Sequence, residues 1–137
     1  MFMSYRKLEI WKNARVLNKI IYKLSSDFPK EENYGLKSQL RRSSVSVVSN
    51  IAEGSGYESN QQFLKYLFIG LGSLCEVETQ CYLSYDLAYI DKLKLDNLID
   101  SSDKLKRMIL SFMKKLRSDN KLILSFLLSY NLISLFI

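Results

Sequence analysis

The stretch QLRRSSVSVVSNIAEGSG, from Gln39 to Gly56, decides the fold. Starting just before it, small or apolar residues recur in steps of three and four, the spacing of one face of an α-helix. These residues are Leu36, Leu40, Ser44, Val47 and Ile51. Gly54 and Gly56 are expected to end the helix, because glycine reaches left-handed backbone conformations at little cost. Small serines among valines predict close contact with a neighbouring helix.

The same spacing occurs on both sides of this stretch. An N-terminal helix is predicted from about Leu8 to Asp27, and Phe28-Pro29 is expected to break it. Ser59 followed by Gln62 has the form of a capping box that opens a third helix, and a fourth is predicted from about Lys92 to Arg117. No segment alternates like a strand. The sequence therefore predicts an all-α fold, an antiparallel up-down-up-down four-helix bundle with short connections.

The apolar stripes of these three helices define the expected core. They comprise Trp11, Ala14, Leu17, Ile21, Leu24 and Phe28; Phe63, Leu67, Gly70, Leu74, Val77, Cys81, Ser84 and Ala88; and Leu95, Leu98, Ser102, Leu105, Ile109, Phe112 and Leu116. Gly70 and Gly72 cost about 1 kcal/mol each against alanine inside a helix. Close approach of a neighbouring helix would justify that cost.

The C-terminal segment has a different composition. Leu122 to Ile137, LILSFLLSYNLISLFI, contains no charged residue, and as a helix it would extend only ~24 Å against a hydrocarbon core of ~30 Å. Three interpretations stay open: a membrane anchor, a fifth helix buried in the protein or its oligomer, or an extension with no fixed role. The expected organisation is a bundle domain over residues 1–117 and an apolar tail over residues 118–137.

The composition argues against an enzyme. The chain has no histidine, so the commonest general base and metal ligand are both missing. Gly54 and Gly56 are not followed by the lysine of a phosphate-binding loop. Cys75 and Cys81 have no zinc-site spacing and are too far apart on a helix for a disulfide. We expect buried, reduced thiols in a cytoplasmic protein, and the start of the chain lacks the apolar run of a signal peptide. No metal, cofactor or catalytic residue is predicted.

The charges are segregated along the chain. The net charge is +6 over residues 1–42, −6 over residues 43–103 and +6 over residues 104–137. Such segregation either steers a polyanion to one surface or reflects pairing between neighbouring helices. The candidate phosphate-binding cations are a stripe on the first helix, Lys12, Arg15, Lys19 and Lys23, with Arg6, Lys7, Arg41, Lys104, Arg107, Lys114 and Lys115.

The polar residues of the opening stretch have two possible roles. Arg42, Ser46 and Glu53 lie along one side of the helix, which would suit an ion pair with a neighbouring helix or subunit. Arg41 either pairs internally or faces a polyanion. The candidate structural and oligomer contacts are Arg42, Ser46, Asn50, Glu53, Gly70 and Glu76.

Several motifs resemble one known family. The segments LEIWKNA, FPKEENYGLKSQLRRSSVSVVSNIAEGSG and QFLKYLFIGLGSLCEVETQ occur in the order typical of four helix bundle proteins, often encoded in intervening sequences of bacterial 23S ribosomal RNA genes. The resemblance covers about residues 5–117. It implies an all-α bundle that assembles as a ring-like homo-oligomer, a pentamer in related proteins. A relative is the accessory protein of diversity-generating retroelements, which binds nucleic acid and a reverse transcriptase. The family offers no catalytic residues to transfer.

Two functional hypotheses follow. In the first, the protein is a non-enzymatic oligomer that binds RNA or DNA phosphates through its basic surface, with weak sequence preference and steep salt dependence. In the second, it is a protein-interaction scaffold whose basic face docks an acidic protein or pairs with the acidic third helix. Coverage of the stripe by Glu76, Glu78 or Asp86 would favour the second.

Overall fold

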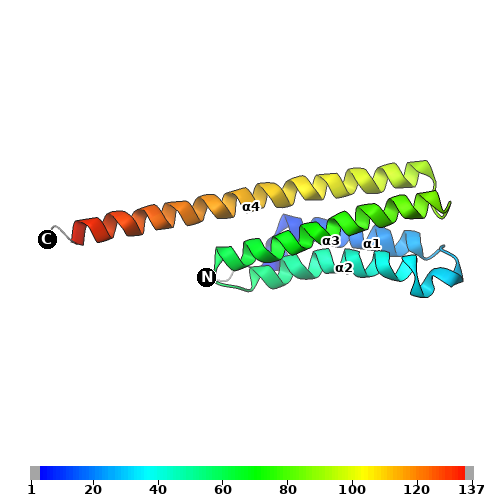
Figure 1. The fold of residues 1–137 in the computed structure, drawn as a ribbon, viewed down its shortest axis with the longest axis horizontal. Coiled ribbons are helices and arrows are strands. Elements are labelled where there is room, and N and C mark those ends of the chain that lie inside the picture. The colour runs from blue at the N-terminus through cyan, green and yellow to red at the C-terminus, as the bar shows by residue number, and fades with distance from the viewer. Residues whose placement is uncertain (1–3, 135–137) are drawn as a thin grey trace.

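A computed structural model describes residues 4–134, with side chains to residue 129, and the remaining residues of the predicted tail lie outside the described range. The elements are a short 3-10 helix η1 (Tyr5–Lys7), α1 (Glu9–Ser25), a second 3-10 helix η2 (Lys30–Tyr34), α2 (Leu36–Ser55), α3 (Asn60–Asp86) and α4 (Lys92–Ser134). Figure 1 shows the four α-helices side by side in alternating directions. The predicted antiparallel four-helix bundle is confirmed.

The helices pack in a ring of neighbours. α1 packs directly against α2 and α4, and α3 also packs against α2 and α4, whereas α1 and α3 lie diagonally opposite each other and no Cα atoms of the two helices are within 8 Å in the described chain. The predicted stripes form the core, with Ile21, Leu40, Leu67 and Ile109 fully buried. In α4 the predicted core residue Phe112 is only partly buried and packs against the ring of Phe63, while the neighbouring Met113 is fully buried. Ala88 lies beyond the end of α3 and is exposed.

Serines connect α2 to both of its neighbours. Ser43 Oγ donates to Gln80 Oε1 on α3 at 2.6 Å, and Ser46 Oγ lies 2.7 Å from Ser73 Oγ. On the other side, Asn18 Nδ2 of α1 donates to Ser44 Oγ at 2.8 Å. Small side chains let the backbones approach, and their hydroxyls find partners at the contact, so that no buried side-chain nitrogen or oxygen is left unsatisfied among the described residues.

The connection between α1 and α2 is held by Glu32, which lies in η2. Glu32 Oε2 accepts the backbone N–H of Leu36 at 2.6 Å, which caps the start of α2. Tyr89 donates its hydroxyl to Glu32 Oε1 at 3.0 Å, and this bond raises the pKa of Tyr89. At the start of α3, the predicted cap is confirmed, because Ser59 Oγ accepts the N–H of Gln62 at 3.4 Å.

Two expectations about the glycines were wrong, the left-handed conformation at the end of α2 and the close approach of a helix at Gly72. α2 ends at Ser55 as predicted, but no glycine in the described chain has a positive φ. Gly54 is needed for space, because an added Cβ would lie 2.7 Å from Tyr66 Cβ and 2.8 Å from Phe63 Cδ2. At buried Gly70 an added Cβ would lie 3.8 Å from Asn50 Cβ and Val47 O of α2, an ordinary contact, so α2 approaches here but leaves room for a Cβ; at Gly72 there is nothing within 4 Å. The tightest approach is therefore at Gly54, towards the other end of the same interface.

The predicted end of the fourth helix at Arg117 was also wrong. α4 continues without interruption to Ser134 and extends beyond the ends of the other helices (Figure 1). The described part of the tail is thus not a separate fifth helix and is not buried within its own chain: every side chain from Lys121 to Ser129 is exposed. Among residues 4–134, no helix has the combination of length and apolar character needed to cross a membrane.

Candidate functional site

The four cations of the α1 stripe lie on the exposed side of their helix. Lys12, Arg15, Lys19 and Lys23 are all exposed. Lys12 is partly neutralised by Glu9, whose Oε1 lies 2.7 Å from Lys12 Nζ. Arg15 and Lys19 have no ion pair within the described residues. The predicted stripe is therefore available at the surface.

Three of these cations border a groove between α1 and α2. The open space measures about 620 Å³. Its walls are formed by Trp11, Lys12, Arg15, Val16, Asn18, Lys19, Val45, Val48 and Ser49. The Arg15 guanidinium lies 4.7 Å from the centre of the Trp11 ring, which holds the charge over the groove at little entropic cost. An exposed apolar floor is supplied by Val16, which is 59% exposed, and by Val45.

A second basic groove lies on the other side of α1, against α4. Lys7, Arg107 and Lys115 line it together with the apolar side chains of Ile10 and Phe112. Sequence reasoning placed these cations on separate helices, and the fold brings them together. The remaining predicted cations, Arg6, Lys23, Lys104 and Lys114, are exposed and line neither groove.

Arg41 does not belong to this surface. Its Nε donates to Ser25 Oγ at 2.8 Å and its Nη2 donates to the backbone carbonyl of Tyr22 at 3.1 Å. The guanidinium also lies 4.5 Å from the centre of the Tyr22 ring. The internal role that the sequence left open for Arg41 is therefore the observed one: it ties α2 to the last turn of α1.

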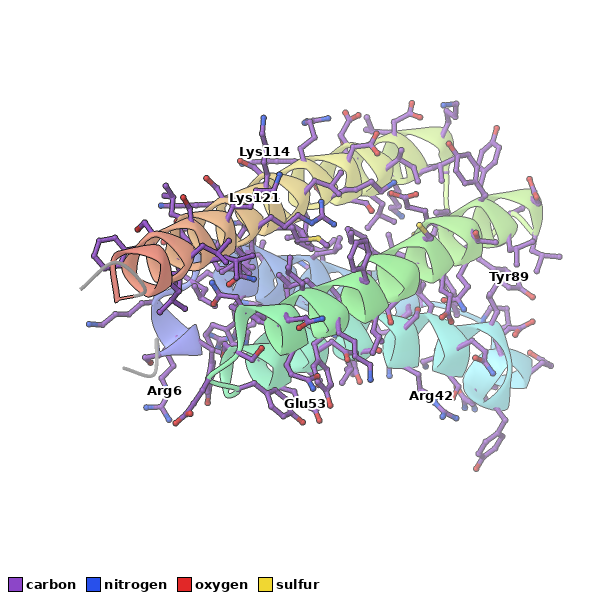
Figure 2. All side chains as sticks on the ribbon, turned by 60° about the vertical axis from the view of Figure 1, so that its left-hand side comes forward. Arg6, Arg42, Glu53, Tyr89, Lys114 and Lys121 are labelled. Atoms are coloured by element: carbon purple, nitrogen blue, oxygen red, sulfur yellow. The ribbon has the colours of Figure 1, made fainter. Side chains whose placement is uncertain are left out.

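The ion pair that the sequence predicts between this side of α2 and a neighbouring helix is not formed by Arg42 or Glu53 within the described residues. Both side chains are exposed and come from different parts of α2 (Figure 2), and neither has an ion-pair partner in the described residues. Arg42 lines an open hollow of about 690 Å³ with Lys37 and Ser38. Asn50 donates back to Ser46 of its own helix, and Glu76 is exposed. A contact of Arg42 or Glu53 with another subunit stays a prediction.

The acidic third helix pairs with α4 instead of α1. Glu78 accepts from Ser102 Oγ at 2.7 Å and from Lys106 Nζ at 3.0 Å, and this carboxylate raises the pKa of Lys106. None of the carboxylates named as possible covers, Glu76, Glu78 and Asp86, forms an ion pair with a stripe cation among the described residues. The pairing of charges between neighbouring helices that was predicted as one alternative is thus observed for Lys106, whereas among the described residues no stripe cation pairs with another helix.

The cysteines and tyrosines offer no nucleophile at this surface. Burial raises the pKa of the Cys81 thiol to about 12, whereas Cys75 is exposed, against the expectation that both are buried. Near the connection between α2 and α3, the hydrogen bond with Tyr57 and partial desolvation raise the pKa of Tyr66 to about 12. Among the described residues, no group of histidine, cysteine or acidic side chains is placed to hold a metal ion.

Sequence reasoning missed the groove itself. Trp11, Val16 and Val45 were assigned to core stripes or to no role, and they form part of its surface. The spacing of Trp11 and Arg15, one helical turn apart, was the available signal, since an arginine four residues after an aromatic residue lies over its ring.

Comparison with known proteins agrees with this architecture. A crystal structure of a protein of unknown function from the S23 ribosomal protein family of Bacteroides thetaiotaomicron VPI-5482 superposes with a TM-score of 0.71 and 21% identity, covering 77% of this chain and 98% of that chain. At this identity the likeness shows the fold alone. No curated protein matches the sequence, and neither the family nor the structural neighbour carries a named reaction.

The family match covers most of the bundle. Residues 6–111 match the family described as 23S rRNA-intervening sequence protein. The matched range includes α1, α2 and α3 and ends within α4, so the projecting part of α4 lies outside it. The chain belongs to the family of 23S rRNA-intervening sequence proteins.

Proposed function

We propose that this protein is a non-enzymatic, cytoplasmic homo-oligomer that binds RNA phosphates through the basic surface around α1. The observation that carries the proposal is the groove between α1 and α2, where Arg15 and Lys19 are exposed, unpaired within the described chain and beside an aromatic ring. Repetition of this surface in an oligomer adds avidity. The family resemblance supports the oligomer, with a pentamer as its expected size.

The groove suits a nucleic-acid backbone in two respects. Lysine and arginine side chains are the usual partners of phosphate oxygens, and they fix position without reading the base sequence. The apolar floor and Trp11 offer stacking or packing surface beside the cations. The second groove, with Lys7, Arg107 and Lys115, would extend the same surface to the other side of α1. DNA phosphates carry the same chemistry, and the choice of RNA rests on the family description.

Charge reversal tests the proposal. Replacement of all four stripe cations, Lys12, Arg15, Lys19 and Lys23, by glutamate should abolish retention of a structured RNA hairpin at low salt. Removing four favourable charges and adding four repulsive ones eliminates the electrostatic attraction that supplies nearly all non-specific binding. Unchanged retention by a variant that still forms the wild-type oligomer would refute the proposal.

A matched pair of variants separates local contact from net charge. Two double variants lower the net charge by the same amount. The first is Arg15→Glu with Lys19→Glu, and the second is Lys65→Glu with Lys94→Glu. Lys65 lies on α3 and Lys94 near the start of α4, and neither lines a basic groove. The first pair should lose RNA retention and the second should keep most of it. Equal losses would mean that overall charge, and not this surface, attracts the RNA.

A protein partner is the second candidate. The same groove exposes Val16 and Val45 between cations, a pattern that suits an amphipathic helix with an acidic side. In that case RNA retention would be weak in the wild type and unaffected by the Arg15 and Lys19 variants, while capture of an acidic helical peptide would depend on them.

A further inference from the structure

The projecting end of α4 exposes an apolar surface that the bundle does not cover. We call residues 117–134 the tail helix. Six of its large apolar side chains are 53–73% exposed within two turns: Leu122, Ile123, Leu124, Phe126, Leu127 and Leu128. Contiguous apolar surface of this kind marks an interaction site in a stable protein. Figure 1 shows this part of α4 without neighbouring helices.

One face of the tail helix continues the buried face of α4. Within the bundle this face is formed by Ile109, Met113 and Leu116, all buried. Continuing in steps of four, three and four, the same face carries Asn120, Ile123 and Leu127. The spacing is that of the seam of a coiled coil. Inside the bundle, α1 and α3 cover this face; beyond their ends it requires another helix.

The charged residues at the start of the tail helix indicate what kind of helix can pack against it. Arg117, Asp119 and Lys121 are two residues apart, and each step of two turns the side chain by about 200°. Asp119 therefore lies on one side of the helix, and Arg117 and Lys121 lie on the other. When parallel tail helices are arranged around a rotation axis, the side of one helix that carries Asp119 faces the side of the next helix that carries Arg117 and Lys121. Acidic and basic side chains then meet at the same level.

We propose that the tail helices of neighbouring copies of this chain pack against each other in parallel, with Asn120, Ile123 and Leu127 in the seam. A seam asparagine is satisfied by the same residue of its neighbour only when the helices are parallel and in register. The inference rests on the proposed oligomer and extends it by assigning a segment that holds it together. That segment lies outside the family match, which ends at residue 111.

Disulfide trapping tests this packing in the full-length chain. Exposed Cys75 is first replaced by serine, and Cys81 stays because it is buried. A cysteine introduced by Ile123→Cys should then form a cross-linked pair of about twice the 16.0 kDa chain mass on a non-reducing gel. The matched control, Leu122→Cys, lies about 100° further round the helix and away from the seam, and it should cross-link much less. Equal cross-linking, or none at Ile123→Cys, would overturn the proposal.

Charge exchange supplies a second readout. Asp119→Lys places like charges on both sides of the helix and should weaken assembly about two- to fivefold. Adding Arg117→Asp and Lys121→Asp exchanges the two sides and should restore assembly, measured as the concentration dependence of the solution mass. If the triple variant assembles no better than Asp119→Lys alone, the proposed arrangement of charges between neighbouring tail helices is wrong.

The outcomes also separate this inference from the proposed oligomer. A wild-type oligomeric mass without cross-linking at Ile123→Cys leaves the oligomer intact and overturns the role of the tail. A monomeric mass overturns both. Binding of the wild-type chain to phosphatidylglycerol vesicles, lost on deletion of residues 118–137 and combined with no cross-link, would assign the apolar surface to a lipid bilayer and overturn the proposal.

Discussion

The contact of α2 with α3 makes a sharp prediction about three glycines. In Gly54→Ala, the new Cβ would lie 2.7 Å from Tyr66 Cβ and 2.8 Å from Phe63 Cδ2. The Tyr66 Cβ is fixed to the backbone of α3, and the Phe63 ring packs against Phe112 with centroids 5.4 Å apart. Neither neighbour can yield without moving a helix or opening the core. The alanine side chain would therefore be overpacked.

The magnitude follows from two opposing effects. Overpacking of a well-packed core costs about 1–3 kcal/mol. Alanine regains at most about 1 kcal/mol of helix propensity, and less in the last turn of α2, where Gly54 lies. We expect Gly54→Ala to lower the free energy of unfolding by about 1–2 kcal/mol. Gly72→Ala, with no atom within 4 Å of its Cβ, should raise it by up to about 1 kcal/mol, and Gly70→Ala should behave like Gly72→Ala.

Urea denaturation followed by circular dichroism measures this difference. All variants are compared at one protein concentration, because the stability of an oligomer depends on concentration. The expected result is a lower midpoint for Gly54→Ala and higher midpoints for the two α3 variants, with unchanged slopes. A Gly54→Ala variant as stable as the wild type would refute the close approach of α2 and α3. Destabilisation by Gly72→Ala would show that its surroundings are filled in the assembled protein.

Three further predictions concern single side chains. Arg41→Ala should lower the free energy of unfolding by about 1–2 kcal/mol, because it removes two hydrogen bonds to α1. It should leave RNA retention unchanged, and reduced retention by a folded variant would show that Arg41 contributes to RNA binding. Glu78→Ala should cost about 1–3 kcal/mol, since it leaves the buried hydroxyl of Ser102 without its acceptor and Lys106 with only the more distant carboxylate of Asp103. Thermal unfolding measures this cost, and an unchanged midpoint would contradict the α3–α4 bridge. Cys81 should resist a thiol reagent in the folded chain, while Cys75 reacts. Burial raises the pKa of the Cys81 thiol to about 12 in the folded chain, against about 8.5 in the unfolded chain, so its contribution to the free energy of unfolding is complete below pH 8.5 and decreases as the pH rises toward 12. Fast reaction of both thiols at pH 8 would contradict the burial of Cys81.

The bundle was predictable because apolar spacing depends on the chain alone. Residues in steps of three and four, such as Leu40, Val47 and Ile51 in α2, are buried in the structure as expected. The capping serine at Ser59 and the break at Pro29 are also local signals. Each of these features is set by residues within one or two turns of each other, so one sequence suffices to find them.

Features that depend on the partner helix were not predictable. Whether Gly54 or Gly70 lies at the close approach depends on the opposite helix, and sequence reasoning chose Gly70. The partners of Arg41, sixteen and nineteen residues away on α1, are likewise set by packing. The end of α4 was misplaced for another reason. The composition changes after Arg117, but the sequence contains no glycine or proline beyond Gly72 to stop a helix.

The candidate surface was found only in part. Its cations were identified because lysine and arginine recur at helical spacing on α1, and all four are exposed. The groove beside them needs α2, whose Val45 and Ser49 complete its wall. The groove lined by Lys7, Arg107 and Lys115 joins the N-terminal segment to α4, and residues so far apart in the chain give no local sequence signal.

The salt dependence of RNA binding tests the central claim most directly. The logarithm of affinity falls linearly with the logarithm of salt concentration, and each phosphate that the protein neutralises adds about 0.7–0.9 to the steepness of that line. Arg15→Glu with Lys19→Glu should therefore flatten the wild-type slope by roughly 1.5 units, whereas Lys65→Glu with Lys94→Glu should leave it nearly unchanged. A wild-type slope retained by the Arg15 and Lys19 variant would contradict the assignment of phosphate binding to the surface around α1.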